Sequence, residues 1–187
     1  KFHLPNINVK CTMVIWFTGM SGAGKSTLTH ALCKELMESN YTVHVLDGDV
    51  VRRKNNMTNS FTKEAILKNN YSIIQECKNN LNKYDFILVS VISPYEKTRQ
   101  FARNTLGEKG YFEVFVNCSI DELIRRDTKG LYAKALNKEL DVIGFSNRLS
   151  YEQPKFADVT LETDLRDTHD SLKIIKAKLK QLAYMIN

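Results

Sequence analysis

One short glycine-rich segment constrains the fold more than any other part of this sequence. Residues 18–27, TGMSGAGKST, follow the apolar run MVIWF and precede LTHALCKEL, which is typical of a helix. The stretch from Gly19 to Ser26 fits G-x-x-x-x-G-K-[ST], which average residue frequencies produce in about one window in 30,000. Glycines at a strand-to-helix turn let backbone N–H groups converge on phosphate oxygens. The segment therefore predicts a nucleoside triphosphate site.

Apolar, β-branched runs alternate with stretches of helical period along the rest of the chain. Strands are predicted near 12–18, 42–46, 86–92, 112–117 and 159–162, and helices near 26–39, 63–81, 94–106, 120–126 and 168–185. This order predicts a three-layer α/β domain of the P-loop NTPase type, with a parallel five-stranded sheet and helices on both faces. We expect this single domain to span 12–187 and residues 1–11 to be an N-terminal extension.

Local signals predict where three of the helices begin or pack. Capping boxes in the runs 93–96, SPYE, and 119–122, SIDE, place a serine three residues before a glutamate at a helix start. The last helix has one apolar face, formed by Leu172, Ile175, Leu179 and Leu182. That face predicts docking on the sheet, with a partner-binding helix as the alternative.

Charge and composition narrow the class of partner. A net charge of +6 attracts anions, which include nucleic acids and small phosphorylated compounds. The basic residues are dispersed, without a basic tail, zinc-finger or RNP pattern, so we expect no nucleic-acid partner.

The longest apolar runs are too short to span a membrane, and the first ten residues do not resemble a signal peptide. The four cysteines lack metal or redox spacing, so we expect a cytoplasmic protein with reduced thiols and no membrane partner.

The glycine-rich segment supplies candidate residues for both ATP and Mg²⁺. Lys25 is expected to reach the β- and γ-phosphates, and Ser26 to ligate the metal. The ATP-binding residues predicted from this segment are Gly19, Ser21, Gly22, Ala23, Gly24, Lys25, Ser26 and Thr27.

Two carboxylates follow the second predicted strand. TVHVL runs directly into Asp47-Gly48-Asp49, at the carboxyl edge where open α/β sheets bind ligands. One acid can orient Mg²⁺, with Asp47 the candidate beside Ser26, and one can accept a proton from an attacking hydroxyl. The sequence does not assign the base to Asp47 or to Asp49, and an ordinary Asp-Gly turn is the alternative reading.

A basic segment after the fourth strand is a candidate lid. The run 125–132, RRDTKGLY, places three cations and a glycine where they could close over the phosphates. Such cations stabilise the transferred phosphoryl group, and closure excludes water. Arg126 is the predicted ATP contact. The alternative is a solvated helix end that the helix dipole favours.

Taken together, these blocks resemble the adenylylsulfate kinases, P-loop kinases that use ATP to phosphorylate the 3′-hydroxyl of adenosine 5′-phosphosulfate (APS). The similarity runs from about Val14 to Thr163 through IWFTGMSGAGKST, VLDGDVVR, VISPYEKTRQFAR and EVFVNCSIDELIRRDTKGLY, and more loosely through GFSNRLSYEQP and LETD. The resemblance implies a Mg²⁺-dependent homodimeric enzyme of sulfate assimilation.

The resemblance also implies an acceptor site between the second-strand carboxylates and the lid. Asp49 and Arg52 would meet the acceptor's sugar and phosphosulfate, and Phe61 would stack on its base. The other implied acceptor-site residues are Asn69, Ile92, Ser93 and Lys134.

The chain departs from the family at two acceptor-side positions. Val50 stands where the family has asparagine, and Ile66 stands where the family has an arginine that binds the acceptor's anionic group. Lys63, one helical turn before Ile66, is a candidate replacement. A lysine offers a point charge and not the two-pronged contact of arginine, so the two are not equivalent.

Three functions remain open from the sequence. The leading hypothesis is an ATP-dependent kinase of APS. The nearest alternative keeps the reaction and changes the acceptor to a related nucleotide such as cytidine diphosphoramidate. The third is a non-catalytic nucleotide-binding module that regulates a sulfate-activating enzyme; the presence of Lys25, Ser26, Asp47 and Asp49 together argues against it.

Overall fold

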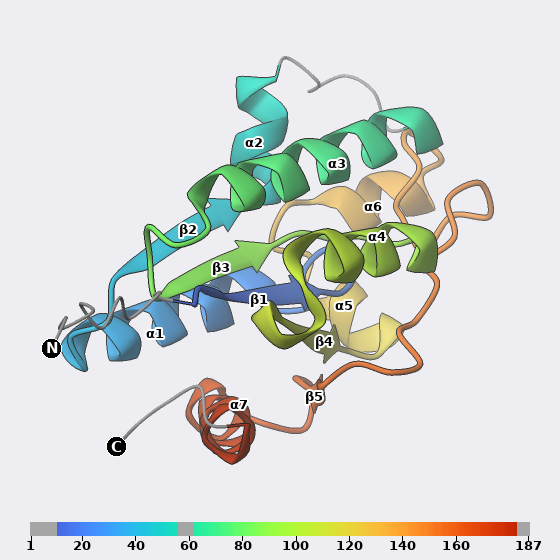
Figure 1. The fold of residues 1–187 in the computed structure, drawn as a ribbon. Helices are drawn as coiled ribbons and strands as arrows, with labels where there is room; N and C mark the ends of the chain where they lie inside the picture. Colours follow the sequence, from blue (N-terminus) through green and yellow to red (C-terminus); the bar gives the residue numbers. More distant parts are fainter. Residues whose placement is uncertain (1–10, 56–61, 183–187) are drawn as a thin grey trace, which may run out of the picture.

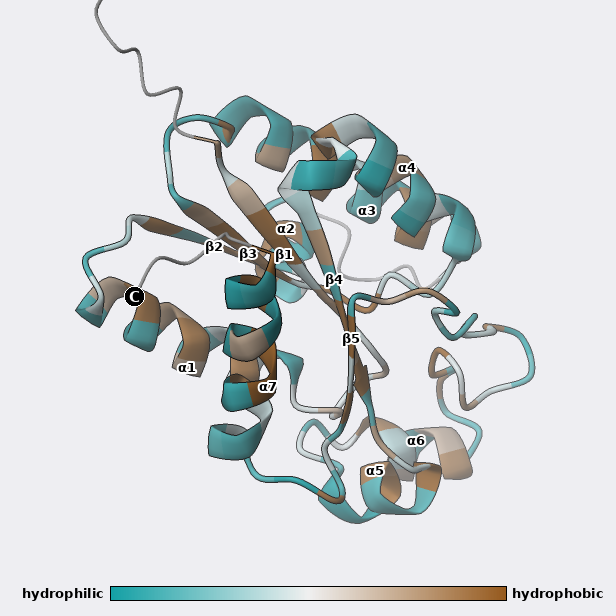
Figure 2. Cartoon of the chain, turned by 60° about the horizontal axis from the view of Figure 1, so that its bottom comes forward, coloured by the Kyte–Doolittle hydropathy of each residue, from teal (hydrophilic) through white to brown (hydrophobic). Residues whose placement is uncertain are grey.

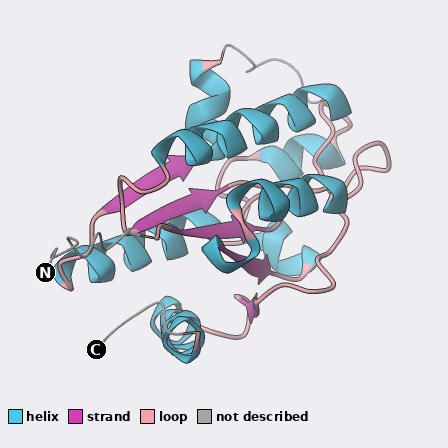
Figure 3. Cartoon of the chain, in the orientation of Figure 1, coloured by secondary structure: helices cyan, strands magenta, loops and turns pink. Residues whose placement is uncertain are grey.

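A parallel five-stranded sheet forms the centre of the molecule. The computed structural model describes residues 11–55 and 62–182. The strands are β1 (Met13–Thr18), β2 (Val43–Asp47), β3 (Phe86–Ser90), β4 (Tyr111–Asn117) and β5 (Val159–Glu162). They lie in the order β2-β3-β1-β4-β5, and every neighbouring pair is parallel. The first strand therefore lies at the middle of the sheet, with β2 and β3 on one side of it and β4 and β5 on the other (Figures 1 and 3).

Helices cover both faces of this sheet. They are α1 (Lys25–Glu38), α2 (Gly48–Lys54), α3 (Lys63–Asn80), α4 (Glu96–Leu106), α5 (Ile120–Arg126), α6 (Leu131–Leu136) and α7 (Thr168–Gln181), with a 3₁₀ turn, η1, at Glu108–Gly110. Helices α1 and α7 lie on one face and α3 and α4 on the other (Figures 1 and 2). The predicted three-layer α/β architecture is confirmed.

Strand β1 shows why the sheet is buried on both faces. All six of its residues are buried, as expected of a central parallel strand. Ile15 and Phe17 pack with α1 and α7, whereas Val14 and Trp16 pack with α3 and α4. Because successive side chains point to opposite faces, one apolar run supplies both halves of the core.

Two short helices at the functional edge were not predicted. Helix α2 has seven residues and α6 has six, which is too short for a helical period to stand out in the sequence. Strand β3 ends at Ser90, two residues before its predicted end. The residues after it form the β3–α4 loop.

The capping box predicted at 93–96 is wrong. Helix α4 begins at Glu96, and Ser93 lies before it with a buried side chain and a φ of 47°. The Glu96 N–H instead donates to Oε2 of Glu152, 2.7 Å away, so a residue far along the chain caps this helix. Ser119 is the N-cap residue of α5, as predicted, but makes no side-chain capping bond among the described residues.

The last helix docks as predicted. Leu172, Ile175 and Leu179 are buried in the cluster that includes α1 and β5. Leu182 lies beyond the helix end and is 42% exposed, so it does not extend that face. In the described part of the chain, all four cysteines are free, and no helix has the length and apolarity needed to cross a membrane.

Candidate functional site

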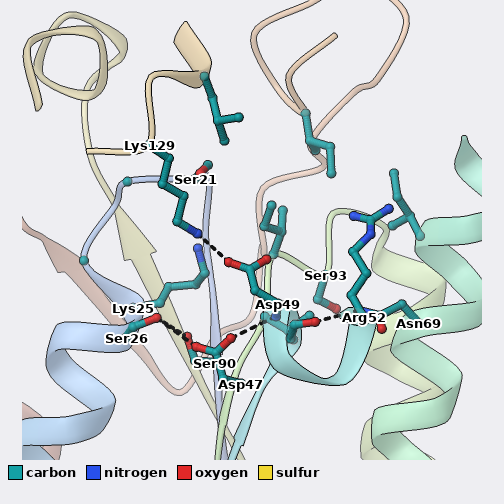
Figure 4. A pocket seen from close by; sticks show the side chains of 18 of the residues that line it. Ser21, Lys25, Ser26, Asp47, Asp49, Arg52, Asn69, Ser90, Ser93 and Lys129 are labelled. Carbon is teal, nitrogen blue, oxygen red and sulfur yellow. Dashed lines mark hydrogen bonds and ion pairs between the residues drawn. The ribbon is translucent and has the colours of Figure 1, made fainter. Parts of the chain in front are cut away.

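A pocket of about 380 Å³ lies at the carboxyl edge of the sheet. The β1–α1 turn, the β2–α2 junction, α3, the β3–α4 loop and the segment between α5 and α6 all contribute to it (Figure 4). The predicted site residues that line this pocket are Ser21, Gly22, Gly24, Lys25, Ser26, Thr27, Asp47, Asp49, Arg52, Asn69, Ile92 and Ser93. With the loop that carries Ile143, residues from six separate segments thus surround one cavity.

The β1–α1 turn requires glycine at two positions. A Cβ on Gly19 would lie 2.3 Å from the carbonyl oxygen of Val116, so no larger residue fits beside β4. Gly24 caps α1 with a φ of 102°, a conformation that L side chains rarely adopt. Gly19 and Ala23 shape the turn without lining the pocket.

Lys25 is held inside this turn. Its Nζ donates to the carbonyl oxygens of Gly19, at 2.9 Å, and Met20, at 2.8 Å. Burial, together with the charge of Lys129, lowers the pKa of Lys25 to about 8, although Asp49 and Asp47 act in the opposite direction. The ammonium group therefore lies at the phosphate turn, where an anionic ligand would raise its pKa again.

Ser26 and Asp47 form a pair that suits Mg²⁺. Ser26 Oγ donates to Oδ2 of Asp47 at 3.1 Å and lies 3.2 Å from Oγ of Ser90. The other carboxylate oxygen of Asp47 accepts the N–H groups of Asp49 and Val50, which fixes it as the N-cap of α2. One hydroxyl and one carboxylate match the sparse protein ligation of Mg²⁺ in phosphoryl-transfer sites. No cluster of three acidic, histidine or cysteine side chains that could hold a metal occurs in the described ranges.

An ion pair crosses the pocket between α2 and the predicted lid. Lys129 Nζ binds Oδ2 of Asp49 (Figure 4). Partial burial acts to raise the pKa of Asp49, but the hydrogen bond and charge of Lys129, followed by Lys25 and Arg52, lower it overall. Asp49 is therefore ionised at neutral pH.

Three predicted site residues lie elsewhere or were not placed. Arg126 binds Glu122 and the carbonyl oxygen of Thr163, and it is not among the pocket-lining residues. Thr163 in turn donates to the carbonyl oxygen of Ala23 at 2.7 Å, so Arg126 braces the outer side of the phosphate turn. Lys134 is exposed on α6 and does not line the pocket either. Phe61 lies outside the described residues.

The acceptor side contains an apolar wall where the family resemblance implied an arginine. Ile66 is 5% exposed and packs with Tyr95, Ile143 and Leu149 while lining the pocket. Lys63, the candidate replacement, lies with its Nζ 5.1 Å from the ring centroid of Tyr95 and does not line the pocket. The structure therefore gives no support to Lys63 as a substitute.

Sequence reasoning missed several lining residues. These include Asn70, Ser90, Thr128, Lys129, Leu131 and Ile143. Lys129 belonged to the predicted lid, but nothing in the run RRDTKGLY distinguished it from its basic neighbours. Ile143 carries no chemical signal at all, because only the fold brings its loop to α3.

A four-residue run elsewhere matches the N-K-x-D pattern with which GTPases recognise guanine. Asn82 to Asp85 reads NKYD, directly before β3. Asp85 accepts hydrogen bonds from the N–H and hydroxyl of Thr42, just before β2, each at 2.7 Å. The run therefore lies at the amino edge of the sheet, away from the pocket, and its aspartate stabilises a strand junction.

Comparisons with known proteins agree with this geometry. The family model described as Adenylylsulphate kinase matches residues 11–162. The chain is 41% identical over 175 residues to an adenylyl-sulfate kinase of Gloeothece citriformis, covering 92% of this chain and 97% of that protein. It is 43% identical over 176 residues to one of Chloroflexus aurantiacus, covering 93% and 92%. A structure of the Mycobacterium tuberculosis APS kinase in complex with AMPPNP and APS superposes with a TM-score of 0.81 at 31% identity, covering 91% of this chain and 98% of that one.

Proposed function

The chain belongs to the adenylylsulphate kinase family, and we propose that it transfers the γ-phosphoryl group of ATP to the 3′-hydroxyl of APS. One observation carries the proposal: the phosphate turn with Lys25, the Ser26–Asp47 pair and the Asp49–Arg52 side all line a single pocket. Donor and acceptor can therefore meet without crossing bulk water. A relative of the same fold was solved with AMPPNP and APS bound, which supports this pairing of substrates.

The donor half holds the triphosphate. Backbone N–H groups of the β1–α1 turn and the start of α1 would bind phosphate oxygens, and the dipole of this helix favours their charge. Lys25 would exchange its two carbonyl partners for the β- and γ-phosphates. Mg²⁺, held by Ser26 and Asp47, would neutralise charge on the transferred group.

The acceptor half positions the hydroxyl. We assign Asp47 to the metal side, because it already binds Ser26 and two backbone N–H groups. Asp49 is left as the carboxylate that orients the hydroxyl and takes its proton. Phosphoryl transfer requires little covalent assistance, so orientation matters more than basicity, and a carboxylate with a lowered pKa is adequate.

Lys129 is the lid cation of this proposal. It reaches Asp49 from the segment between α5 and α6, across the pocket from Ser26. When the phosphates are bound, their charge competes with Asp49 for this ammonium group. Its release from Asp49 would free the carboxylate for the acceptor hydroxyl.

A second candidate acceptor follows from Ile66. An apolar side chain at the position of the family arginine removes a charged contact to the acceptor's anionic group. Cytidine diphosphoramidate, which carries a phosphoramidate group where APS carries sulfate, is the acceptor we place second. The reaction and the donor half would be unchanged.

Steady-state kinetics with a small acceptor panel tests this proposal. ATP consumption is measured with APS, cytidine diphosphoramidate and adenosine 5′-monophosphate, with each reaction repeated in the Lys25→Ala variant. We expect the highest kcat/KM with APS. Turnover with the cytidine compound and none with APS would replace the first acceptor by the second.

The assembly, the metal and the compartment are also proposals. The family resemblance supports a homodimer, Mg²⁺ as the metal and a cytoplasmic location. Analytical ultracentrifugation at several protein concentrations tests the dimer: a single species at the monomer mass of 21.5 kDa would contradict it.

A further inference from the structure

One residue on the acceptor side has a backbone conformation that the sequence opposes. Ser93 has a φ of 47°, although it is not glycine and precedes Pro94. Residues before proline favour extended conformations, and positive φ is strained for residues other than glycine. Ser93 lines the pocket (Figure 4), and so does its neighbour Ile92. Strained residues of this kind persist only where surrounding contacts hold them, and they gather at binding sites.

One buried arginine makes several of the contacts that hold this loop. Arg99 on α4 is 1% exposed, and its Nη1 donates to the carbonyl oxygen of Ser93 at 2.8 Å. Its Nη2 donates to the carbonyl oxygen of Glu152, also at 2.8 Å, and to the carboxylate of Glu96. Its Nε lies 3.3 Å from Oε1 of Glu113, a buried acid on β4. The planar guanidinium thus joins the loop to Glu96, Glu113 and Glu152.

The same loop is linked to the phosphate turn. Thr18, the last residue of β1, donates its hydroxyl to the carbonyl oxygen of Ile92 at 2.5 Å and lies 2.9 Å from the hydroxyl of Tyr151. The N–H of Glu152 donates to the carbonyl oxygen of Pro94 at 2.8 Å. The pocket wall is therefore fixed relative to both the donor half and the segment at 151–152.

We propose that Arg99 is a positioning residue for the acceptor: by holding the Ser93 carbonyl and the Glu152 carbonyl together, it sets the shape of the Ile92–Ser93 wall against which the acceptor nucleotide binds. Arg99 itself does not line the pocket. The proposal rests on the proposed function for the identity of the acceptor, but not for the role of the wall.

Helix α4 offers a matched control. Arg103, one turn along, also pairs with Glu113 and with Asp158, at 3.1 Å from Oδ2, but none of its described contacts is with the Ile92–Ser93 wall. Lysine at either position keeps a positive charge near Glu113. Only at position 99 does the substitution remove the guanidinium group whose two nitrogens bind the carbonyl oxygens of Ser93 and Glu152.

The test compares Arg99→Lys with Arg103→Lys in steady-state kinetics. In Arg99→Lys we expect the KM of the acceptor to rise about tenfold or more, because displacement of a substrate-positioning wall weakens alignment. The KM of ATP should stay within about twofold of wild type, and Arg103→Lys should leave both values near wild type. Equal changes in both KM values, or no change in a folded Arg99→Lys protein, would overturn the proposal.

A second measurement does not depend on turnover. Hydrogen exchange at the Glu96 and Glu152 amides, which bind across the loop, should accelerate in Arg99→Lys and not in Arg103→Lys. If Arg99→Lys does not fold, the Arg99→Met/Glu113→Gln double variant removes the buried charge pair together and is assayed in its place. Failure of wild type to use APS would contradict the proposed function alone; unchanged exchange at both amides would contradict the role of Arg99.

Discussion

The donor and acceptor halves of the pocket are built in different ways. The donor half comes mainly from one continuous segment, in which Lys25 binds carbonyl groups only five and six residues away. The acceptor half is assembled from α2, α3, the β3–α4 loop and the loop that carries Ile143. Arg99, for example, joins residues from Ser93 to Glu152. A substitution on the acceptor side can therefore change the substrate while the donor half stays intact.

The burial of charge shows the same contrast. Lys25 lines a cavity, so a bound anion there would partner its charge. Arg99 and Glu113 are buried against each other permanently. Removing one partner of such a pair leaves an uncompensated charge, whereas removing Lys25 leaves room for water. The donor half should therefore be sensitive in activity, and the acceptor wall in both activity and stability.

The largest expected effect is at Lys25. Lys25→Ala should lower turnover by about 10²-fold or more, because one contact to the transferred charge is typically worth that much. The melting temperature should change little. Lys34→Ala on the same helix, where the lysine side chain is 78% exposed, is the control and should keep wild-type kcat. A Lys25→Ala enzyme with more than about a tenth of wild-type turnover would contradict the assignment of Lys25 to the phosphates of ATP.

The roles of Asp47 and Asp49 at the β2–α2 junction should be distinguishable by Mg²⁺ dependence and by the pH–rate profile. Asp47→Asn and Asp49→Asn should each lower kcat, by about 10²-fold for the residue that orients the hydroxyl. Only Asp47→Asn should need higher Mg²⁺ to reach its maximal rate, since Asp47 binds Ser26. Only Asp49→Asn should flatten the acidic limb of the pH–rate profile. If Mg²⁺ dependence shifts in Asp49→Asn instead, the two roles are exchanged.

A smaller effect is expected at Ile66, where the acceptor side departs from the family. In Ile66→Arg, a well-placed guanidinium should strengthen APS binding by about 1.5–3 kcal/mol, measured as a lower KM for APS. The same change should lower stability by about 1–3 kcal/mol, because it overpacks the cluster of Tyr95, Ile143 and Leu149. Ile66→Leu is the control for packing alone. An unchanged or higher KM for APS would favour a pocket built for another nucleotide.

The smallest effect is a proton uptake at Lys25. Its pKa of about 8 in the ligand-free protein should rise when phosphates bind, so ATP binding above about pH 8 should take up part of a proton. Titration calorimetry in buffers of different ionisation enthalpy measures this uptake. Lys25→Ala should show none. An equal uptake in both proteins would assign the proton to another group.

The free energy of unfolding should depend on pH through the lowered pKa of Lys25. Between about pH 8 and the ordinary lysine pKa of 10.5, the unfolded chain keeps a proton that folded Lys25 has released. The contribution of Lys25 to the free energy of unfolding therefore rises with pH across this window. Lys25→Ala should remove that contribution, as measured by denaturant unfolding at pH 7.5 and 9.5.

The two halves also differ in how far the sequence predicts them. The order of strands and helices and the phosphate turn follow from local patterns, because period and glycine spacing are local properties. The pairing of Asp47 with Ser26 could also be predicted from the sequence, since Asp47 ends a strand at the edge where ligands bind. The conformation of Ser93 could not be predicted from the sequence. Its capping pattern predicted a helix start, but contacts from Arg99 and Glu152 hold the loop and the start of α4 in a different arrangement. Lys129 and Ile143 enter the pocket through the fold alone.

The most direct test of the central claim follows the phosphorus atom itself. Wild-type protein is incubated with Mg²⁺, ATP labelled in the γ-phosphoryl group and APS, and the position of the label is determined by ³¹P NMR of the purified nucleotide product. We expect a new monoester phosphate on the 3′-oxygen of APS, formed at the wild-type rate by Lys34→Ala and about 10²-fold or more slowly by Lys25→Ala. Label found only in inorganic phosphate, or on no nucleotide although ATP binds, would contradict this claim.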